Sequence, residues 1–194
     1  VDLFRYLAAR FMAEARARMK DHGLGLIDMV VCNLYPFQSV IQKKNVSLDE
    51  AIENIDVGGP TMLRAAAKNF KSVAVICNPK RYEEILNELN TTQGLLADQI
   101  LFNLALETFQ HTAQYDQAIS EFLGKRLTSE DFDFFPKHMN FQYSKMQELR
   151  YGENPHQKGA FYKTADRQEG LANLKQLHGK ELSFNNYLDL SYAL

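Results

Sequence analysis

Apolar residues recur at helical spacing over much of this chain. In residues 3–19 the apolar stripe repeats in four-residue steps, with mostly arginine and glutamate side chains off the stripe. Ser47 and Glu50 form a capping box that opens a short helix. We expect Gly124 to end the last long helix, because glycine commonly terminates helices. The same periodicity predicts further helices over residues 61–69, 80–90 and 95–123.

Two short apolar runs, residues 27–32 and 72–77, lack the alternation of a half-exposed strand. They predict strands that are covered on both faces. Each run is followed closely by a proline, Pro36 or Pro79, which cannot continue a strand ladder. Strands that alternate with helices indicate an α/β fold with parallel pairing. Two strands alone are too few to make a sheet of ordinary size.

The helical periodicity of apolar residues ends after residue 124. Residues 125–146 have no periodicity but several aromatic residues, which predicts a linker that packs by its aromatic side chains. We therefore expect domains at 1–124 and 147–194, the second with a strand near 160–162 and a helix from about Leu188. The chain begins with Val1 rather than Met and ends inside a helical pattern, which suggests that both ends are cut.

Composition excludes several classes of protein. The 22 Lys and Arg residues and 24 Asp and Glu residues give a net charge of −2, which does not favour a nucleic-acid partner. No apolar run is long enough to span a membrane, and no leader opens the chain. The two cysteines, Cys32 and Cys77, are too few for a metal cluster or a secreted disulfide framework. We expect a reduced, cytoplasmic protein.

The segment Gly58-Gly59-Pro60-Thr61 stands at the start of a predicted helix. Glycines allow close approach of backbone amides, and a helix start presents unpaired N–H groups, so the segment suits a phosphate or an oxyanion. The alternative is a tight turn that needs positive φ. Asp56 and Lys68 flank this segment and could converge on one cleft as base and acid, or could be a solvated surface pair.

Asn33 and Tyr35 follow the first predicted strand, where ligands bind in open α/β sheets. Tyr35 could instead plug the top of the sheet. In the polar turn 150–157, Arg150 could clamp a phosphate and Tyr151 could stack on a base, although a simple capped loop is the alternative. The histidines stand apart from one another, without the spacing of metal ligands.

Five strings together resemble one family, the bifunctional purine biosynthesis enzymes that combine AICAR transformylase with IMP cyclohydrolase. The resemblance covers about residues 21–194. The strings occur in the family's order at residues 33–37, 55–69, 111–116, 149–157 and 179–186.

The resemblance implies a cyclohydrolase domain with a methylglyoxal-synthase-like fold, a Rossmann-like parallel sheet that is incomplete here on its N-terminal side. It implies next the start of a transformylase domain with a cytidine-deaminase-like fold. The family transfers a formyl group from 10-formyltetrahydrofolate to AICAR and then closes formyl-AICAR to IMP. The resemblance also implies a cytosolic homodimer, with no metal.

Matched by position, Asp56, Lys68 and Tyr35 would be cyclohydrolase catalytic residues. Asp56 would orient or deprotonate the attacking amide, and Lys68 and Tyr35 would stabilise the developing oxyanion. Residues implied to bind substrate are Asn33, Gly58, Gly59 and Thr61 in the first region and Arg150, Tyr151, His156 and Asn186 in the second.

The sequence departs from the family at its beginning and lacks most of the transformylase, including that enzyme's Lys-His pair. Our leading hypothesis is therefore a piece of the bifunctional enzyme that is not competent for formyl transfer by itself. One alternative is a non-catalytic nucleotide-binding or assembly module. Another is a working cyclohydrolase in which the arginine-rich residues 1–20 replace the missing phosphate loop.

Overall fold

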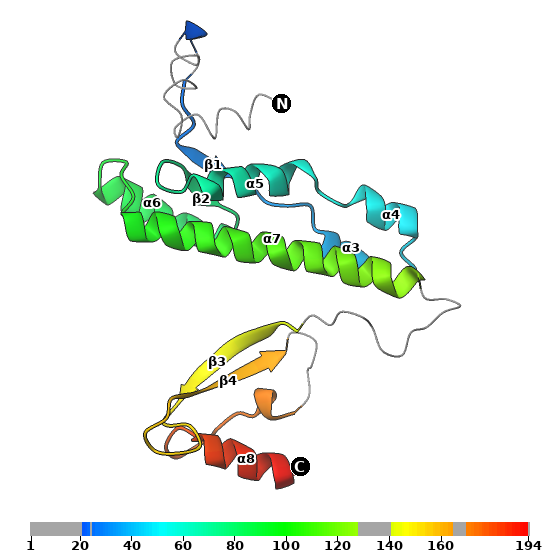
Figure 1. Ribbon diagram of the computed structural model, residues 1–194, viewed down its shortest axis with the longest axis vertical. Helices are drawn as coiled ribbons and strands as arrows, with labels where there is room; N and C mark the ends of the chain where they lie inside the picture. The colour runs from blue at the N-terminus through cyan, green and yellow to red at the C-terminus, as the bar shows by residue number, and fades with distance from the viewer. Residues whose placement is uncertain (1–20, 24, 128–140, 165–169, 194) are drawn as a thin grey trace. The chain divides into compact units, whose positions relative to one another are not determined.

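The computed structural model describes residues 21–23, 25–127, 141–164 and 170–193. The chain divides into two compact units, Val1–Asp133 and Phe134–Leu194, which we call unit 1 and unit 2 and treat separately (Figure 1). The helix predicted over residues 3–19 lies outside the described residues. Helix α7 extends into the segment predicted as a linker, and strand β3 begins within it. The assignment of the two units to two catalytic domains stays a prediction.

Unit 1 contains a pair of short parallel strands, as the sequence predicts. Strand β1 (Met29–Val31) pairs with strand β2 (Ala74–Ile76), with Met29 opposite Ala74 and Val31 opposite Ile76. Every residue of β2 is buried. Val31 of β1 is 52% exposed, so the prediction that both strands are covered on both faces is correct for β2 only.

Helices of unit 1 differ from their predicted bounds at two glycine positions. The segment at Gly58 forms the first turn of α5 instead of preceding it, and α7 continues through Gly124. Gly124 is not among the glycines with positive φ in the described residues, the conformation with which a glycine ends a helix. The bounds are α3 (Phe37–Ile41), α4 (Leu48–Glu53), α5 (Gly58–Lys68), a 3-10 turn (Pro79–Arg81), α6 (Tyr82–Thr91) and α7 (Asp98–Leu127).

The predicted capping box is confirmed, because Ser47 Oγ accepts a hydrogen bond of 3.0 Å from the Glu50 amide. It opens α4 and satisfies one of the N–H groups that a helix start leaves unpaired. Elsewhere in unit 1, Leu89 near the end of α6 and Leu96 in the following loop pack against the core.

Buried side chains hold the two strands against α5 and α7. On one face of the strands, Leu63, Ala66 and Ala67 of α5 pack with β2 and with Ala105 of α7. The small alanines let the helix approach the strands closely. On the other face, Ile76 packs with α6 and α7. A separate cluster joins Phe37 of α3 to Tyr115 and Phe122 of α7, with edge-on rings 6.1 and 5.8 Å apart.

Unit 2 consists of an antiparallel hairpin, a 3-10 turn (Leu171–Asn173) and one helix. Strands β3 (Tyr143–Leu149) and β4 (Gly159–Thr164) pair with an irregularity between Lys145 and Gln147. The strand predicted near residue 160 is confirmed, whereas β3 was not predicted because its residues are mostly polar. Helix α8 (Phe184–Ala193) begins four residues before the predicted Leu188.

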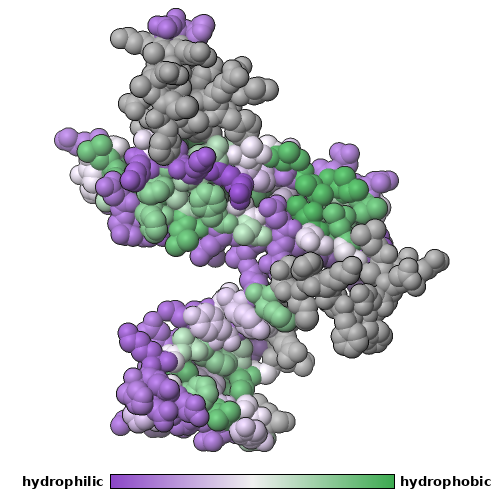
Figure 2. All heavy atoms as spheres, in the orientation of Figure 1, coloured by the Kyte–Doolittle hydropathy of each residue, from purple (hydrophilic) through white to green (hydrophobic). Residues whose placement is uncertain are grey.

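In Figure 2 the apolar residues on the visible face of unit 1 form separate patches with polar residues between them. Among the residues that the structure describes, no helix combines the length and the apolar character needed to cross a bilayer.

Candidate functional site

The Asp56 carboxylate joins two segments that are far apart in the sequence. Its Oδ1 accepts a hydrogen bond of 2.7 Å from the Gly59 amide, and its Oδ2 accepts one of 3.2 Å from the Tyr35 amide. The first bond caps the start of α5, where backbone N–H groups otherwise lack partners. The second holds the loop after β1 against that helix start. We call this arrangement the Asp56 clamp.

Gly59 is required at the clamp for reasons of space. A Cβ at this position would lie 2.6 Å from Asp56 Oδ2 and 2.7 Å from Leu34 Cδ2, well inside van der Waals contact. Neither Gly58 nor Gly59 is among the residues with positive φ, so the tight-turn alternative is wrong. A Cβ on Gly58 would meet open space. The two neighbouring glycines therefore differ: only Gly59 is dictated by the packing.

Tyr115 supports the clamp from α7. Its hydroxyl accepts a hydrogen bond of 2.9 Å from the Asp56 amide and donates one of 3.2 Å to the Asn54 carbonyl. The side chain is buried, and burial is the main cause of the raised pKa of its phenol. The sequence did not single out Tyr115 for a role at the site. Its only signal was its place in the string at residues 111–116.

Asp56 and Lys68 do not converge in this structure, contrary to the expectation of a base–acid pair. Asp56 caps the beginning of α5, and Lys68 is exposed in its last turn. At 1.5 Å of rise per residue, the 11 residues of α5 separate the two by about 16 Å along the helix axis. None of the described hydrogen bonds or ion pairs joins the two side chains, so they form no direct proton-exchange pair in this structure.

The remaining residues predicted for this site differ in whether their side chains already form hydrogen bonds within the protein. The Asn33 side-chain amide donates to the Tyr82 hydroxyl at 3.2 Å. The Thr61 hydroxyl donates a hydrogen bond of 2.7 Å to the Val57 carbonyl at the start of α5. The Tyr35 side chain is 58% exposed beside the clamp and does not plug the sheet. Tyr35 therefore presents a hydroxyl that a ligand could reach.

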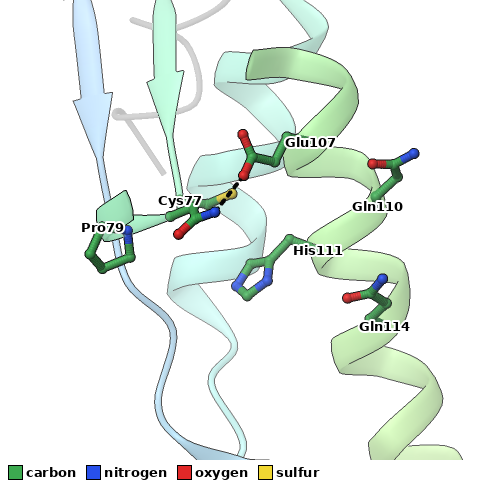
Figure 3. A pocket seen from close by; sticks show the side chains of 7 residues that line it. Cys77, Pro79, Glu107, Gln110, His111 and Gln114 are labelled. Carbon is green, nitrogen blue, oxygen red and sulfur yellow. Dashed lines mark hydrogen bonds between the residues drawn. The ribbon is translucent and has the colours of Figure 1, made fainter. Parts of the chain in front are cut away.

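A pocket of about 420 Å³ lies at the carboxyl end of β2, where α/β proteins commonly bind ligands. Glu107 and His111 project from α7 toward the chain that follows the strand (Figure 3). Asn78 donates a 2.6 Å hydrogen bond to Glu107, and Arg81 Nε lies 3.5 Å from the same carboxylate. The lining residues are Cys77, Asn78, Pro79, Glu107, Gln110, His111 and Gln114.

In unit 2 the structure brings together three of the four predicted residues. The Arg150 guanidinium lies 5.6 Å from the centre of the Tyr151 ring and donates a 3.4 Å hydrogen bond to Asn186 Oδ1. Asn186 Oδ1 also accepts from the Ser183 amide and hydroxyl, at 3.0 and 2.9 Å. This ties the start of α8 to the end of β3. His156 is exposed in the turn, and no described hydrogen bond joins it to the other three.

Within the described ranges, no group of three or more His, Cys, Asp or Glu side chains is arranged to hold a metal ion. What the site in unit 1 offers is a set of hydrogen-bond donors and acceptors around the Asp56 clamp. What unit 2 offers is a guanidinium and an aromatic ring on one surface, groups suited to a phosphate and a base.

Comparison with protein families gives two matches that together span most of the chain. A profile described as the AICARFT/IMPCHase bienzyme matches residues 66–194, and a profile described as an MGS-like domain matches residues 8–61. The expectation that the sequence departs from the family over residues 1–20 is therefore wrong for most of that segment, because the second profile begins at residue 8.

Individual relatives agree with these profiles. Proteins named "Bifunctional purine biosynthesis protein PurH" from Thermoanaerobacter sp. (strain X514) and Ruminiclostridium cellulolyticum are 49% and 51% identical over 188 and 189 residues. Each alignment covers 97% of this chain but 36% of the relative, so the chain spans about a third of their length. A solved structure described as "Crystal structure of ForH" matches with a TM-score of 0.56 and 30% identity over 62% of each chain.

Proposed function

The chain belongs to the AICARFT/IMPCHase bienzyme family, and from that membership we propose that it is a piece of an enzyme that catalyses the last two steps of purine synthesis and that it does not complete formyl transfer by itself. These steps are formyl transfer from 10-formyltetrahydrofolate to AICAR and ring closure of formyl-AICAR to IMP. The family resemblance drawn from the five sequence strings is confirmed by the profiles and the relatives. We propose further that unit 1 binds the nucleotide of the closure step and unit 2 binds AICAR.

The observation that carries the proposal for unit 1 is the Asp56 clamp. It unites the string after β1 with the string at the start of α5, through Tyr35 and Gly59. Ring closure requires a carboxamide nitrogen to attack a formyl carbon while a proton leaves nitrogen and charge develops on oxygen. In our proposal the Tyr35 hydroxyl donates to that oxygen. Asp56 keeps the tyrosine loop and the glycine segment in place.

For Lys68 the proposal rests on the family resemblance. We propose that its ammonium contacts a part of the nucleotide distant from Asp56, because α5 separates the two side chains. Asn33 and the amides of Gly58 and Gly59 would bind the same nucleotide. Thr61 would join them only if its hydroxyl left the Val57 carbonyl.

In unit 2 we propose that Arg150 binds the AICAR phosphate, that Tyr151 contacts its ring and that Asn186 orients the arginine. The hydrogen bond between Arg150 and Asn186 supports this assignment. His156 would belong to the same site only through a rearrangement of the turn. We propose also that the protein works in the cytosol as a homodimer, as the resemblance implies.

A second function, a nucleotide-binding module without catalysis, is favoured by one observation. Asp56 and Lys68 are held at opposite ends of α5, so the chain lacks a directly coupled base–acid pair at this position. Under this alternative the chain binds IMP but does not release water from formyl-AICAR.

The proposal is tested by calorimetric titration of the 194-residue chain with IMP and with AICAR. We expect Asp56→Asn to weaken IMP binding about tenfold or more and to leave AICAR binding unchanged. Arg150→Met should weaken AICAR binding and leave IMP binding unchanged, because a charge-assisted contact to phosphate contributes about 1.5–3 kcal/mol. Lys158→Met is the matched control for Arg150, since it removes an exposed cation from the neighbouring turn.

A second assay follows the ring closure of formyl-AICAR by absorbance. It distinguishes the enzyme from the non-catalytic binding module. Ring closure that is lost in Lys68→Met but kept in Lys71→Met, an exposed lysine just past the same helix, supports the enzyme. Binding of IMP without closure supports the module. If neither nucleotide binds, the proposed function is wrong for this chain.

A further inference from the structure

The two cysteines of the chain occupy matching positions on neighbouring strands. The parallel register pairs Val31 with Ile76, and Cys32 and Cys77 are the next residues of each strand. The pattern continues to this point, because the Cys32 amide donates a 3.0 Å hydrogen bond to the Ile76 carbonyl. Neighbouring strands lie about 4.7–4.9 Å apart. That spacing falls inside the range of about 4.4–6.8 Å between Cα atoms of disulfide-bonded cysteines, whereas Cβ atoms that point the same way keep the strand spacing and must move closer by a few tenths of an ångström to reach the usual separation of about 3.5–4.5 Å.

Both thiols lie on the same face of the strand pair. Val75 and Cys77 of one strand and Val30 and Cys32 of the other all belong to the cluster that packs under α5. Side chains at matching positions of parallel strands point the same way, because they alternate between the two faces with a period of two. Each sulfur is therefore directed toward the same layer of the core.

A small molecule can reach this pair from the candidate site. The Cys77 side chain is only 6% exposed, but it lines the pocket at the carboxyl end of β2 (Figure 3). Cys32 is half-buried and follows the exposed end of β1. Cys77 thus lines the pocket, and the Cys32 thiol lies 3.9 Å from the Asn33 carbonyl, at the start of the loop that carries Tyr35.

We propose that Cys32 and Cys77 form an oxidisable dithiol, which a low-molecular-weight disulfide converts to an intramolecular cross-strand disulfide. The Cys32 sulfur attacks one sulfur of the oxidant and releases one thiol. Cys77 then attacks the mixed disulfide at the Cys32 sulfur and releases the second thiol. Two protein thiols lose their protons and two electrons, and the oxidant is reduced to two thiols.

The surroundings make this reaction slow. Burial and the nearby Asp56 carboxylate raise the pKa of Cys32, and burial and Glu107 raise that of Cys77, although Thr108 donates a hydrogen bond to the Cys77 sulfur. Both groups therefore start as protonated thiols, whereas the thiolate is the attacking species. We expect oxidation over hours with excess oxidant. The product would tie together the carboxyl ends of β1 and β2, beneath the Asp56 clamp.

The test is chemical and does not depend on nucleotide binding or on the proposed function. A dilute solution of the folded chain is incubated with glutathione disulfide, and the remaining thiols are then blocked with an alkylating agent. The mass of the intact chain is measured by mass spectrometry. We expect a monomer that is about 2 Da lighter than the reduced chain and takes up no alkyl group. Protease mapping should recover one cross-linked pair of peptides that contains Cys32 and Cys77.

The variants Cys32→Ser and Cys77→Ser are the controls, and each should give only a reduced chain or a glutathione adduct. A chain oxidised in concentrated guanidinium checks that the oxidant is active. The proposal is overturned if the folded chain keeps two alkylatable thiols under conditions that oxidise the unfolded chain. It is overturned equally by glutathione adducts without a cross-link, or by cross-links between chains.

Discussion

The two units of this protein are stabilised in different ways. Every buried apolar side chain in the described part of the chain belongs to unit 1, where two clusters pack against the strands and a third joins α3 to α7. In unit 2 the described buried residues are Gly152 and Ser183, and large side chains such as Tyr143, Leu177 and Tyr192 are exposed. Strand pairing, a stacked Phe161–Tyr187 pair and local hydrogen bonds hold unit 2.

This difference carries over to the two candidate sites. The Asp56 clamp is braced by a buried tyrosine and an aromatic cluster, and its hydrogen bonds span segments far apart in the chain. The contact between Arg150 and Asn186 is longer, 3.4 Å, and lies at an exposed surface. We therefore expect substitutions of buried residues around the Asp56 clamp to affect stability and binding together, and substitutions of Arg150 and Asn186 to affect binding alone.

The largest effect should come from the core of unit 1. Leu63→Ala removes a side chain with no exposed surface from the cluster between α5 and β2, so we expect unfolding to become easier by about 2–5 kcal/mol. Leu177→Ala, at a side chain that is 85% exposed in unit 2, should change the free energy of unfolding by less than about 0.5 kcal/mol. Guanidinium unfolding followed by circular dichroism measures both. Equal effects would contradict the contrast between the units.

A pair of glycine substitutions tests the clamp itself. Gly59→Ala forces a Cβ against Asp56 and Leu34, and we expect a loss of about 1–3 kcal/mol together with weaker IMP binding. Gly58→Ala places its methyl group in open space within the first turn of α5. It should be neutral, or stabilising by up to about 1 kcal/mol, because alanine loses less backbone entropy than glycine. Similar results for both variants would show that the close approach at Gly59 is not required.

Removal of a single hydroxyl should have a smaller effect. Tyr115→Phe keeps the ring against Phe37 but leaves the Asp56 amide and the Asn54 carbonyl without their partner. We expect a loss of about 1–2 kcal/mol in the free energy of unfolding. The Asp56 and Gly59 amides should also exchange faster with deuterium. Tyr35→Phe, at an exposed hydroxyl, is the control and should leave unfolding and exchange unchanged.

The smallest effect is a dependence of stability on alkaline pH, which also belongs to unit 1. The pKa values of Cys32, Cys77 and Tyr115 are all raised, with burial as the largest cause. Folding therefore favours their protonated forms. The stabilisation is complete below the pKa values of the unfolded chain and is lost as pH rises from about 8 to 11. Denaturation at a series of pH values should show a slope that lessens in Cys32→Ala; an unchanged slope would exclude Cys32 as a contributor.

Local signals in the sequence predicted a good part of the fold. The apolar runs identified both parallel strands, and the Ser47–Glu50 pair identified the start of α4, because each signal acts over a few neighbouring residues. Prediction was wrong where packing overrides local preference. Gly124 does not end α7, and β3 forms from polar residues because β4 pairs with it along the hairpin.

For the site, the sequence alone determined which residue types were present and which family they belong to. Five strings in a fixed order suffice for that, because motif identity does not depend on knowing the contacts. Only the tertiary structure decided what those residues touch. It placed both Asp56 oxygens on backbone amides, separated Lys68 from Asp56 by the length of α5, and brought Tyr115 and the two cysteines into place. Each of these relations joins residues many positions apart, and the burial and pairing that create them exist only in the folded chain.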